Sequence, residues 1–128
     1  MAANINPIFP LVPKCGAATL TTAATEKDGS TATSLLVAGE NGTRLERVVA
    51  KPIGTNVATV LRLFIVGTGY NVIIAEQTIA ESTASEVAAL AEYIIALDYT
   101  LPYGATLKAA LGTTVAAGVQ VAAFGGDY

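Results

Sequence analysis

The chain has 128 residues and a formal net charge of −3, and 52% of its residues are hydrophobic while only 13% are charged. An acidic balance argues against nucleic-acid binding, which depends on clustered Lys and Arg. With no His and one Cys, the usual ligand sets for zinc, haem and iron–sulfur clusters are missing, as are Ser–His and Cys–His catalytic pairs, so we expect no cofactor.

The low charge content bears on how the surface is covered. Charged residues make up about a quarter of an ordinary globular protein, roughly twice the share found here. Two interpretations stay open: part of the surface is buried by assembly with other subunits, or the surface is neutral and rich in Thr, Ala, Asn and Gly.

The first fourteen residues, MAANINPIFPLVPK, predict an extended arm. Prolines every three residues fix an extended backbone, and they lie on one edge of a polyproline II helix. We therefore expect an arm at 1–14 and one domain at 15–128. The arm's candidate partner-binding residues are Ile8, Phe9, Leu11 and Val12. The alternative is a strap on its own core. A secretory signal and a transmembrane helix are not expected, since no stretch has the required apolar run.

Short β-prone runs separated by turn residues follow the arm. The predicted strands are Thr19–Ala24, Ala32–Ala38, Thr43–Ala50, Ala58–Val66, Val72–Ala80, Leu90–Asp98, Ala105–Leu111 and Val119–Phe124. About eight strands at regular spacing are typical of a sandwich or closed barrel. We expect an all-β fold: a single antiparallel β-sandwich or jelly-roll-like barrel with an extended N-terminal arm.

Three turns separate these runs most clearly. Asn41-Gly42 is the strongest hairpin signal in the chain. GTGYN, residues 67–71, predicts a second tight turn. In LPYG, Pro102 and Gly104 suit the second and last positions of a type I turn.

Residues 82–97, STASEVAALAEYIIAL, fit two patterns. Thr83 and Glu86 form a helix capping box, and apolar residues follow at helical spacing. The second half also alternates as a strand does. We predict a loop or helical turn at 82–88 and then a strand.

The run Val60–Val66 is apolar on both faces and is expected to be a central strand. Leu61, Leu63 and Ile65 share one face. Val60, Phe64 and Val66 share the other, so that face must pack against another layer or a subunit.

Basic residues gather in one part of the chain. Arg44, Arg47, Lys51 and Arg62 fall within nineteen residues. They form either a contact patch for an acidic protein surface or internal ion pairs with Glu40, Glu46 and the later glutamates, and both interpretations stay open. Arg44, Arg47 and Lys51 are the candidate partner-binding residues of this group.

Carboxylates are the only remaining candidates for catalysis. Glu76 with Glu81, or Glu92 with Asp98, could meet in space. The second pair would be roughly 20 Å apart along one strand, and solvated carboxylates are the preferred interpretation. We expect no enzymatic activity. Cys15 is predicted to be a small buried hydrophobe.

Residues 43–128 resemble a group of small virion-associated proteins of tailed bacteriophages. The resemblance lies in KPIGTNVATVLRLFI, in NVIIAEQTI and in LPYGATLKAALGTTVAAGVQVAAFGGDY. It implies a β-sandwich or jelly-roll protein of the phage particle, and a capsid decoration (cement) protein suits the size. Such proteins are commonly trimers that clamp adjacent major capsid protein subunits. The implied partners are the major capsid protein and further copies of the chain, and the implied location is the capsid surface of the virion, after synthesis in the host cytoplasm.

Two other functions stay open. A phage tail or host-recognition module could bind a receptor or glycan through exposed aromatic residues such as Tyr70, Tyr103 and Tyr128. A carboxylate-based hydrolase is the third class.

Overall fold

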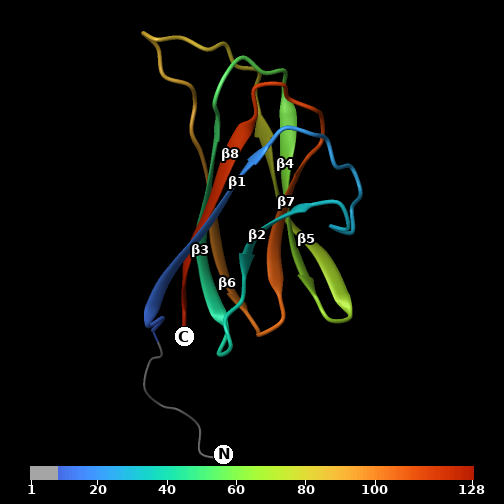
Figure 1. Ribbon diagram of the computed structural model, residues 1–128, viewed down its shortest axis with the longest axis vertical. Coiled ribbons are helices and arrows are strands. Elements are labelled where there is room, and N and C mark those ends of the chain that lie inside the picture. Colours follow the sequence, from blue (N-terminus) through green and yellow to red (C-terminus); the bar gives the residue numbers. More distant parts are fainter. Residues whose placement is uncertain (1–8) are drawn as a thin grey trace, which may run out of the picture.

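The computed structural model describes residues 9–128, and every regular element within that range is a β-strand (Figure 1). The eight strands are β1 (Val12–Leu20), β2 (Thr33–Val37), β3 (Thr43–Pro52), β4 (Thr59–Gly67), β5 (Tyr70–Ile79), β6 (Tyr93–Leu101), β7 (Thr106–Leu111) and β8 (Val119–Asp127). The all-β prediction is confirmed. Within the described residues, no helix could span a membrane.

The strands form two antiparallel sheets of four. The first sheet has the order β1-β8-β3-β6 and the second sheet the order β2-β7-β4-β5. The chain pairs from its ends inward: β1 with β8, β2 with β7, β3 with β6 and β4 with β5. Added pairing of β3 with β8 and of β4 with β7 completes the sheets. This is a long hairpin rolled into a sandwich, which is the jelly-roll arrangement.

The core lies between the two sheets and is made of alternating apolar side chains. Leu61 and Leu63 of β4 are fully buried, as are Leu45 and Val48 of β3. Burying each such side chain stabilises the fold by roughly 1.5–3 kcal/mol. Strand β4 pairs with β5 on one side and β7 on the other, so the prediction that it is central is confirmed.

The second apolar face of β4 is covered by the protein's own chain. Phe64 is fully buried although it lies outside the main core cluster. Gly29, in the connection between β1 and β2, lies against it. A Cβ atom on Gly29 would stand 3.0 Å from Val66 Cγ2 and 3.3 Å from Phe64 Cβ. No other subunit is therefore needed to cover β4 at Phe64.

Asn41-Gly42 does not form the predicted hairpin. Gly42 has a φ of 90° and its N–H donates to the Gly39 carbonyl at 3.0 Å, so the chain does turn here. The turn, however, joins β2 of the second sheet to β3 of the first. The turn residues determine the local bend. Pairing with distant strands determines which sheet each of the two flanking strands joins.

The other two turns agree better with the sequence. In GTGYN, Gly67 pairs with Tyr70 across a two-residue loop, and Gly69 has a φ of 82°, so the predicted tight turn is confirmed. The LPYG turn lies one residue later than predicted, because Ala105 N–H donates to the Pro102 carbonyl. Gly104 is thus the third residue, with a φ of 90°, as a type II turn requires.

The first strand is the largest correction. It was expected at Thr19–Ala24, but β1 spans Val12–Leu20, so Val12, Pro13 and Lys14 belong to the sandwich and not to the predicted arm at 1–14. Proline is tolerated because β1 is an edge strand that pairs only with β8. Residues 1–8 of the predicted arm lie outside the described residues.

The segment whose sequence fits both a helix and a strand begins as a long loop. Residues 80–92 contain no helix, and β6 begins at Tyr93, three residues later than predicted. The hydroxyl of Ser85 accepts hydrogen bonds from the N–H groups of Val87 and Ala88, both at 3.1 Å. These bonds form a bend in place of the predicted capping box. The predicted loop is confirmed, and the predicted start of the strand is wrong.

Candidate binding surface

The outer face of the first sheet collects most of the predicted site residues. In β3, Leu45, Val48 and Ala50 are buried in the core, while Val49 is half-buried and Lys51 exposed on the opposite side. A bulge between Leu45 and Arg47 adds a residue to β3 relative to β8. Both Glu46 and Arg47 are consequently exposed.

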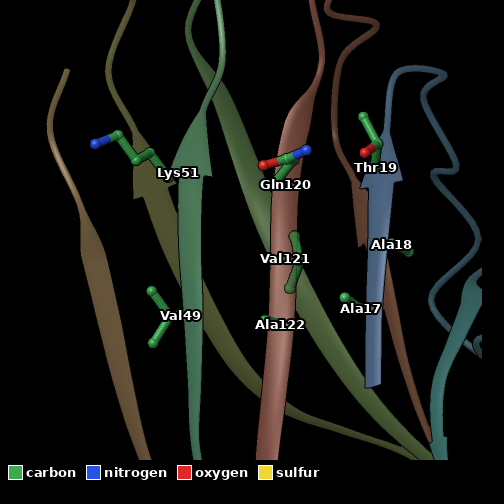
Figure 2. A pocket seen from close by; sticks show the side chains of 8 residues that line it. All are labelled: Ala17, Ala18, Thr19, Val49, Lys51, Gln120, Val121 and Ala122. Atoms are coloured by element: carbon green, nitrogen blue, oxygen red, sulfur yellow. The ribbon is translucent and has the colours of Figure 1, made fainter. Parts of the chain in front are cut away.

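An apolar row crosses all four strands of this face. Strand register places Ala17 opposite Ala122, Ala122 opposite Val49, and Val49 opposite Ile94. Ile94 is 62% exposed. Figure 2 shows Ala17, Ala122 and Val49 side by side, with Thr19, Gln120 and Lys51 forming the next row toward the strand ends. The small side chains leave a shallow hollow between the larger ones.

A second row of facing residues lies beside the apolar row, on the side away from Lys51. Cys15, Phe124, Arg47 and Ala96 stand opposite one another in the same way. The guanidinium of Arg47 lies 5.2 Å from the centre of the Phe124 ring, a cation–π contact. Cys15 is exposed, so the prediction that it is buried is wrong, because β1 turns this side of its backbone outward.

Of the four basic residues, two form internal ion pairs and two are available as a contact patch. Arg44 forms an ion pair with Asp98, and Arg62 pairs with Glu76 on the neighbouring strand at 2.9 Å. Lys51 is exposed and makes no ion pair within residues 9–128. Arg47 and Lys51 are therefore available to a partner, whereas Arg44 and Arg62 are paired internally.

The described end of the predicted arm lies at the margin of the same face. Phe9, Leu11 and Val12 are 71%, 82% and 57% exposed; Ile8 lies outside the described residues. Phe9 and Pro10 line a shallow hollow with Glu46 and Gly126, and Leu11 N–H donates to the Asp127 carbonyl at 2.8 Å. The structure thus brings Phe9 and Arg47 to one face, as neighbours of Glu46.

A polar cluster stabilises the end of the sandwich at which β1 begins and β8 ends. Lys14 Nζ lies 3.2 Å from Asp127 Oδ1 and also donates to the Val37 carbonyl of the second sheet. Asp127 accepts a further hydrogen bond from Thr43 Oγ1. The Thr43 hydroxyl, and then Lys14, hold the pKa of the Asp127 carboxyl below its usual value against the opposing effect of desolvation.

The other candidate residues do not converge. Glu76 and Asp98 are engaged in the ion pairs with Arg62 and Arg44. Nowhere in residues 9–128 do three His, Cys, Asp or Glu side chains gather as a metal site would need. Tyr70 and Tyr103 are 39% and 74% exposed, at the β4–β5 and β6–β7 turns.

Sequence reasoning missed the apolar row itself. Its members Ala17, Ala122, Val49 and Ile94 were not singled out. Val48, Val49 and Ala50 are all apolar, as are Ile94 and Ile95, so the sequence does not show which of them faces outward. Placing the four residues in one row, moreover, needed the pairing of strands that are not neighbours in sequence, β1 with β8, β8 with β3 and β3 with β6.

A comparison with protein-family models gave no match to the chain, and a comparison with curated proteins gave none either. In chemical terms the outer face of the first sheet offers apolar area, the ring of Phe124 with that of Phe9 at the margin, and two available cations. This combination suits contact with another protein, since Phe and Arg are enriched in such interfaces.

Proposed function

We propose that the protein is a structural component of a tailed-phage particle. It binds the capsid shell as a decoration (cement) protein, and a closed oligomer, a homotrimer, clamps neighbouring major capsid protein subunits. The observation that carries this proposal is the apolar row on the outer face of the first sheet, with exposed Phe9, Leu11 and Val12 at the margin of that face.

Exposure of this row supports a binding role. Contiguous apolar surface on a soluble protein marks a site that another molecule covers. Ile94, Val49, Ala122 and Ala17 extend across the full width of the sheet. The low charge content of the chain is then explained in part by the burial of this face in the particle.

The fold and the resemblance point in the same direction. Jelly rolls recur in viral capsid proteins and in lectins, although a fold alone does not specify a function. The resemblance of residues 43–128 to small virion proteins of tailed phages, noted in the sequence, is the reason to propose the first of these settings. The proposed role is mechanical and calls for no catalytic group, cofactor, nucleic acid or membrane.

A closed oligomer suits this role for an energetic reason. A symmetric assembly presents each binding face several times, so contacts that are weak singly add up to tight attachment. The proposed location is the outer surface of the capsid, where each copy touches both a sister copy and the shell.

The test is binding of the purified chain to phage capsids that lack their decoration protein, measured by co-sedimentation. The parent chain should bind saturably. Val49→Asp and Ile94→Asp should abolish binding, because each buries a charge in a contact with the shell or with a sister copy. Val72→Asp is the matched control, since Val72 is 48% exposed on the second sheet. Equal binding by all four proteins would contradict the proposal.

A receptor- or glycan-binding module is the second candidate, and one observation favours it. Tyr103 is 74% exposed and lines a shallow hollow with Glu40, so an apolar ring face stands beside a hydrogen-bond acceptor. Binding to a glycan or a host cell that is lost in Tyr103→Ala, with capsid binding absent, would support this candidate over the first.

A further inference from the structure

The β5–β6 connection, residues 80–92, and the outer face of the first sheet carry opposite charge. The connection contains Glu81, Glu86 and Glu92 and no Lys or Arg. All three glutamates are exposed. On the sheet, Lys51 is exposed and makes no ion pair within residues 9–128, and Arg47 is exposed beside Phe124.

The tip of this connection also carries unshielded apolar groups. Val87 is 97% exposed, and Ala88 and Ala89 are exposed beside it. In Figure 1 the connection extends past the end of the sandwich, between the end of β5 and the start of β6. Almost complete exposure of Val87 means that the tip does not lie on its own sheet.

Hydrogen bonds hold the base of the connection in place. Asn56 and Ser82 exchange two backbone hydrogen bonds, at 3.0 and 2.9 Å. Ser82 Oγ donates to the Gly54 carbonyl at 2.7 Å, and Ala84 N–H donates to Thr55 Oγ1 at 3.0 Å. The tip is therefore presented by an ordered base, which lowers the conformational entropy lost when it binds.

The part of the sheet nearest Lys51 matches the tip in shape and charge. Ala17, Ala122 and Val49 form the hollow, and Lys51 stands at its rim (Figure 2). Two carboxylates on this face lie farther along the strands: Asp98 is already paired with Arg44, and Glu46 is five residues from Lys51 in β3. Glu92 lies near Lys51, because it directly precedes Tyr93, which pairs with Ala50, but the two form no ion pair. The hollow at this end of the face is thus lined by apolar side chains, with Lys51 at its rim and not held in an ion pair within residues 9–128.

We infer that the tip, Glu86–Ala89, docks on the outer face of the first sheet of a second copy of the chain. Val87 enters the hollow between Ala17, Ala122 and Val49, and Glu86 faces Lys51. This inference rests on the proposed self-assembly and names the contact that builds it.

The contact joins two different surfaces. Two copies could exchange it reciprocally in a dimer, and the heterologous arrangement is the one that suits the proposed homotrimer. Each copy gives its tip to one neighbour and its sheet to another, and such contacts close into a ring when the rotation between copies fits. A ring of three would satisfy the homotrimer proposed above. It would also leave the margin with Phe9 and Leu11 free for the shell.

A charge swap tests the contact in the free, full-length protein by sedimentation velocity. Lys51→Glu and Glu86→Lys should each weaken assembly, on the order of tenfold in the concentration at which the oligomer dissociates. The double variant should recover most of this loss. Lys27→Glu is the control for a charge reversal elsewhere, since Lys27 is exposed in the β1–β2 connection. A parent chain that stays monomeric at its highest soluble concentration overturns the inference, as do single variants that assemble like the parent.

Disulfide trapping provides a second readout that does not depend on charge. In a Cys15→Ser background, Ala17→Cys with Val87→Cys should give covalent multimers on mild oxidation, ending at a closed ring. Ala17→Cys with Thr25→Cys is the matched control, because Thr25 is exposed away from the connection. A disulfide formed within one chain would show that the tip folds onto its own sheet and would overturn the inference.

Failure of this contact is distinguishable from failure of the proposed function. A chain that binds capsids but does not assemble through the tip keeps the decoration role and loses the ring contact. A chain whose charge swap behaves as expected but which binds no capsid keeps the contact and loses the decoration role.

Discussion

Lys14 Nζ lies 3.2 Å from the carboxylate of Asp127, although the two residues are 113 positions apart in the chain. This ion pair closes β1 against β8 at the end of the sandwich where the chain enters and leaves. Through its second hydrogen bond, to the Val37 carbonyl, Lys14 also ties the first sheet to the second.

The first prediction concerns the pH dependence of stability. Because the hydroxyl of Thr43 and then Lys14 lower the pKa of Asp127 from its usual value of 3.8, the ionised carboxylate is favoured more in the folded state than in the unfolded state. Its contribution should be fully present above the usual pKa and lost as pH falls through the lower folded pKa. Urea unfolding of the parent and Asp127→Asn should differ near neutral pH and converge in acid.

Glu81→Gln is the control for this measurement, since Glu81 is exposed and makes no ion pair within residues 9–128. It should track the parent at every pH. A constant gap between the parent and Asp127→Asn down to the lowest pH would show that the carboxylate contributes through shape and not through charge.

The second prediction concerns the core. Leu63→Ala should lower the free energy of unfolding by roughly 2–5 kcal/mol, because it leaves a cavity where the side chain is fully buried. Val72→Ala on β5, which is 48% exposed, should cost no more than about 0.5 kcal/mol, as surface changes usually do. Denaturant titration measures both. Similar losses in the two variants would argue against the sandwich core described here.

Burial of Leu63 was accessible from the sequence for a clear reason. The run around it is almost continuously apolar and lies between turn residues, so one strand could be predicted from local pattern alone, and β4 begins and ends within one residue of its predicted bounds. For β1 the same reasoning failed. Proline weighed against a strand, yet an edge strand tolerates Pro13 because only one of its sides is paired.

The binding surface was partly predictable for a related reason. Phe9 is a candidate because it lies in the apolar, proline-spaced arm, and Arg47 and Lys51 are candidates because basic residues gather in that part of the chain. Ala17 and Ala122 gave no such signal, since alanine suits a core and a surface equally. Their importance depends on register between β1 and β8, which no local pattern encodes.

The third prediction concerns close packing of the two sheets at Gly16. A Cβ atom at this position would lie 1.7 Å from the Leu35 carbonyl oxygen in β2, so Gly16→Ala must push β1 and β2 apart. Gly69→Ala is the comparison, because its φ is 82° but nothing lies within 4 Å. Its cost should be the roughly 1–2 kcal/mol of a left-handed backbone alone. Gly16→Ala should lose more stability than this in thermal and urea unfolding. A loss equal to or below that of Gly69→Ala would mean that the edge strand moves away freely.

The last prediction separates the arm from the sandwich by truncation. Removing residues 2–8 leaves every described strand pair in place, so the melting temperature should stay close to that of the parent. Removing residues 2–13 deletes the pairing of Val12 with Asp127 and of Pro13 with Gly126, together with the Leu11–Asp127 hydrogen bond. This longer truncation should lower the melting temperature. On the proposed function, both truncations should weaken capsid binding, since both remove apolar residues that reach a neighbour, and calorimetry with co-sedimentation would measure the two effects side by side. A shorter truncation that destabilises the domain while leaving capsid binding intact would instead identify residues 2–8 as a strap on their own sandwich.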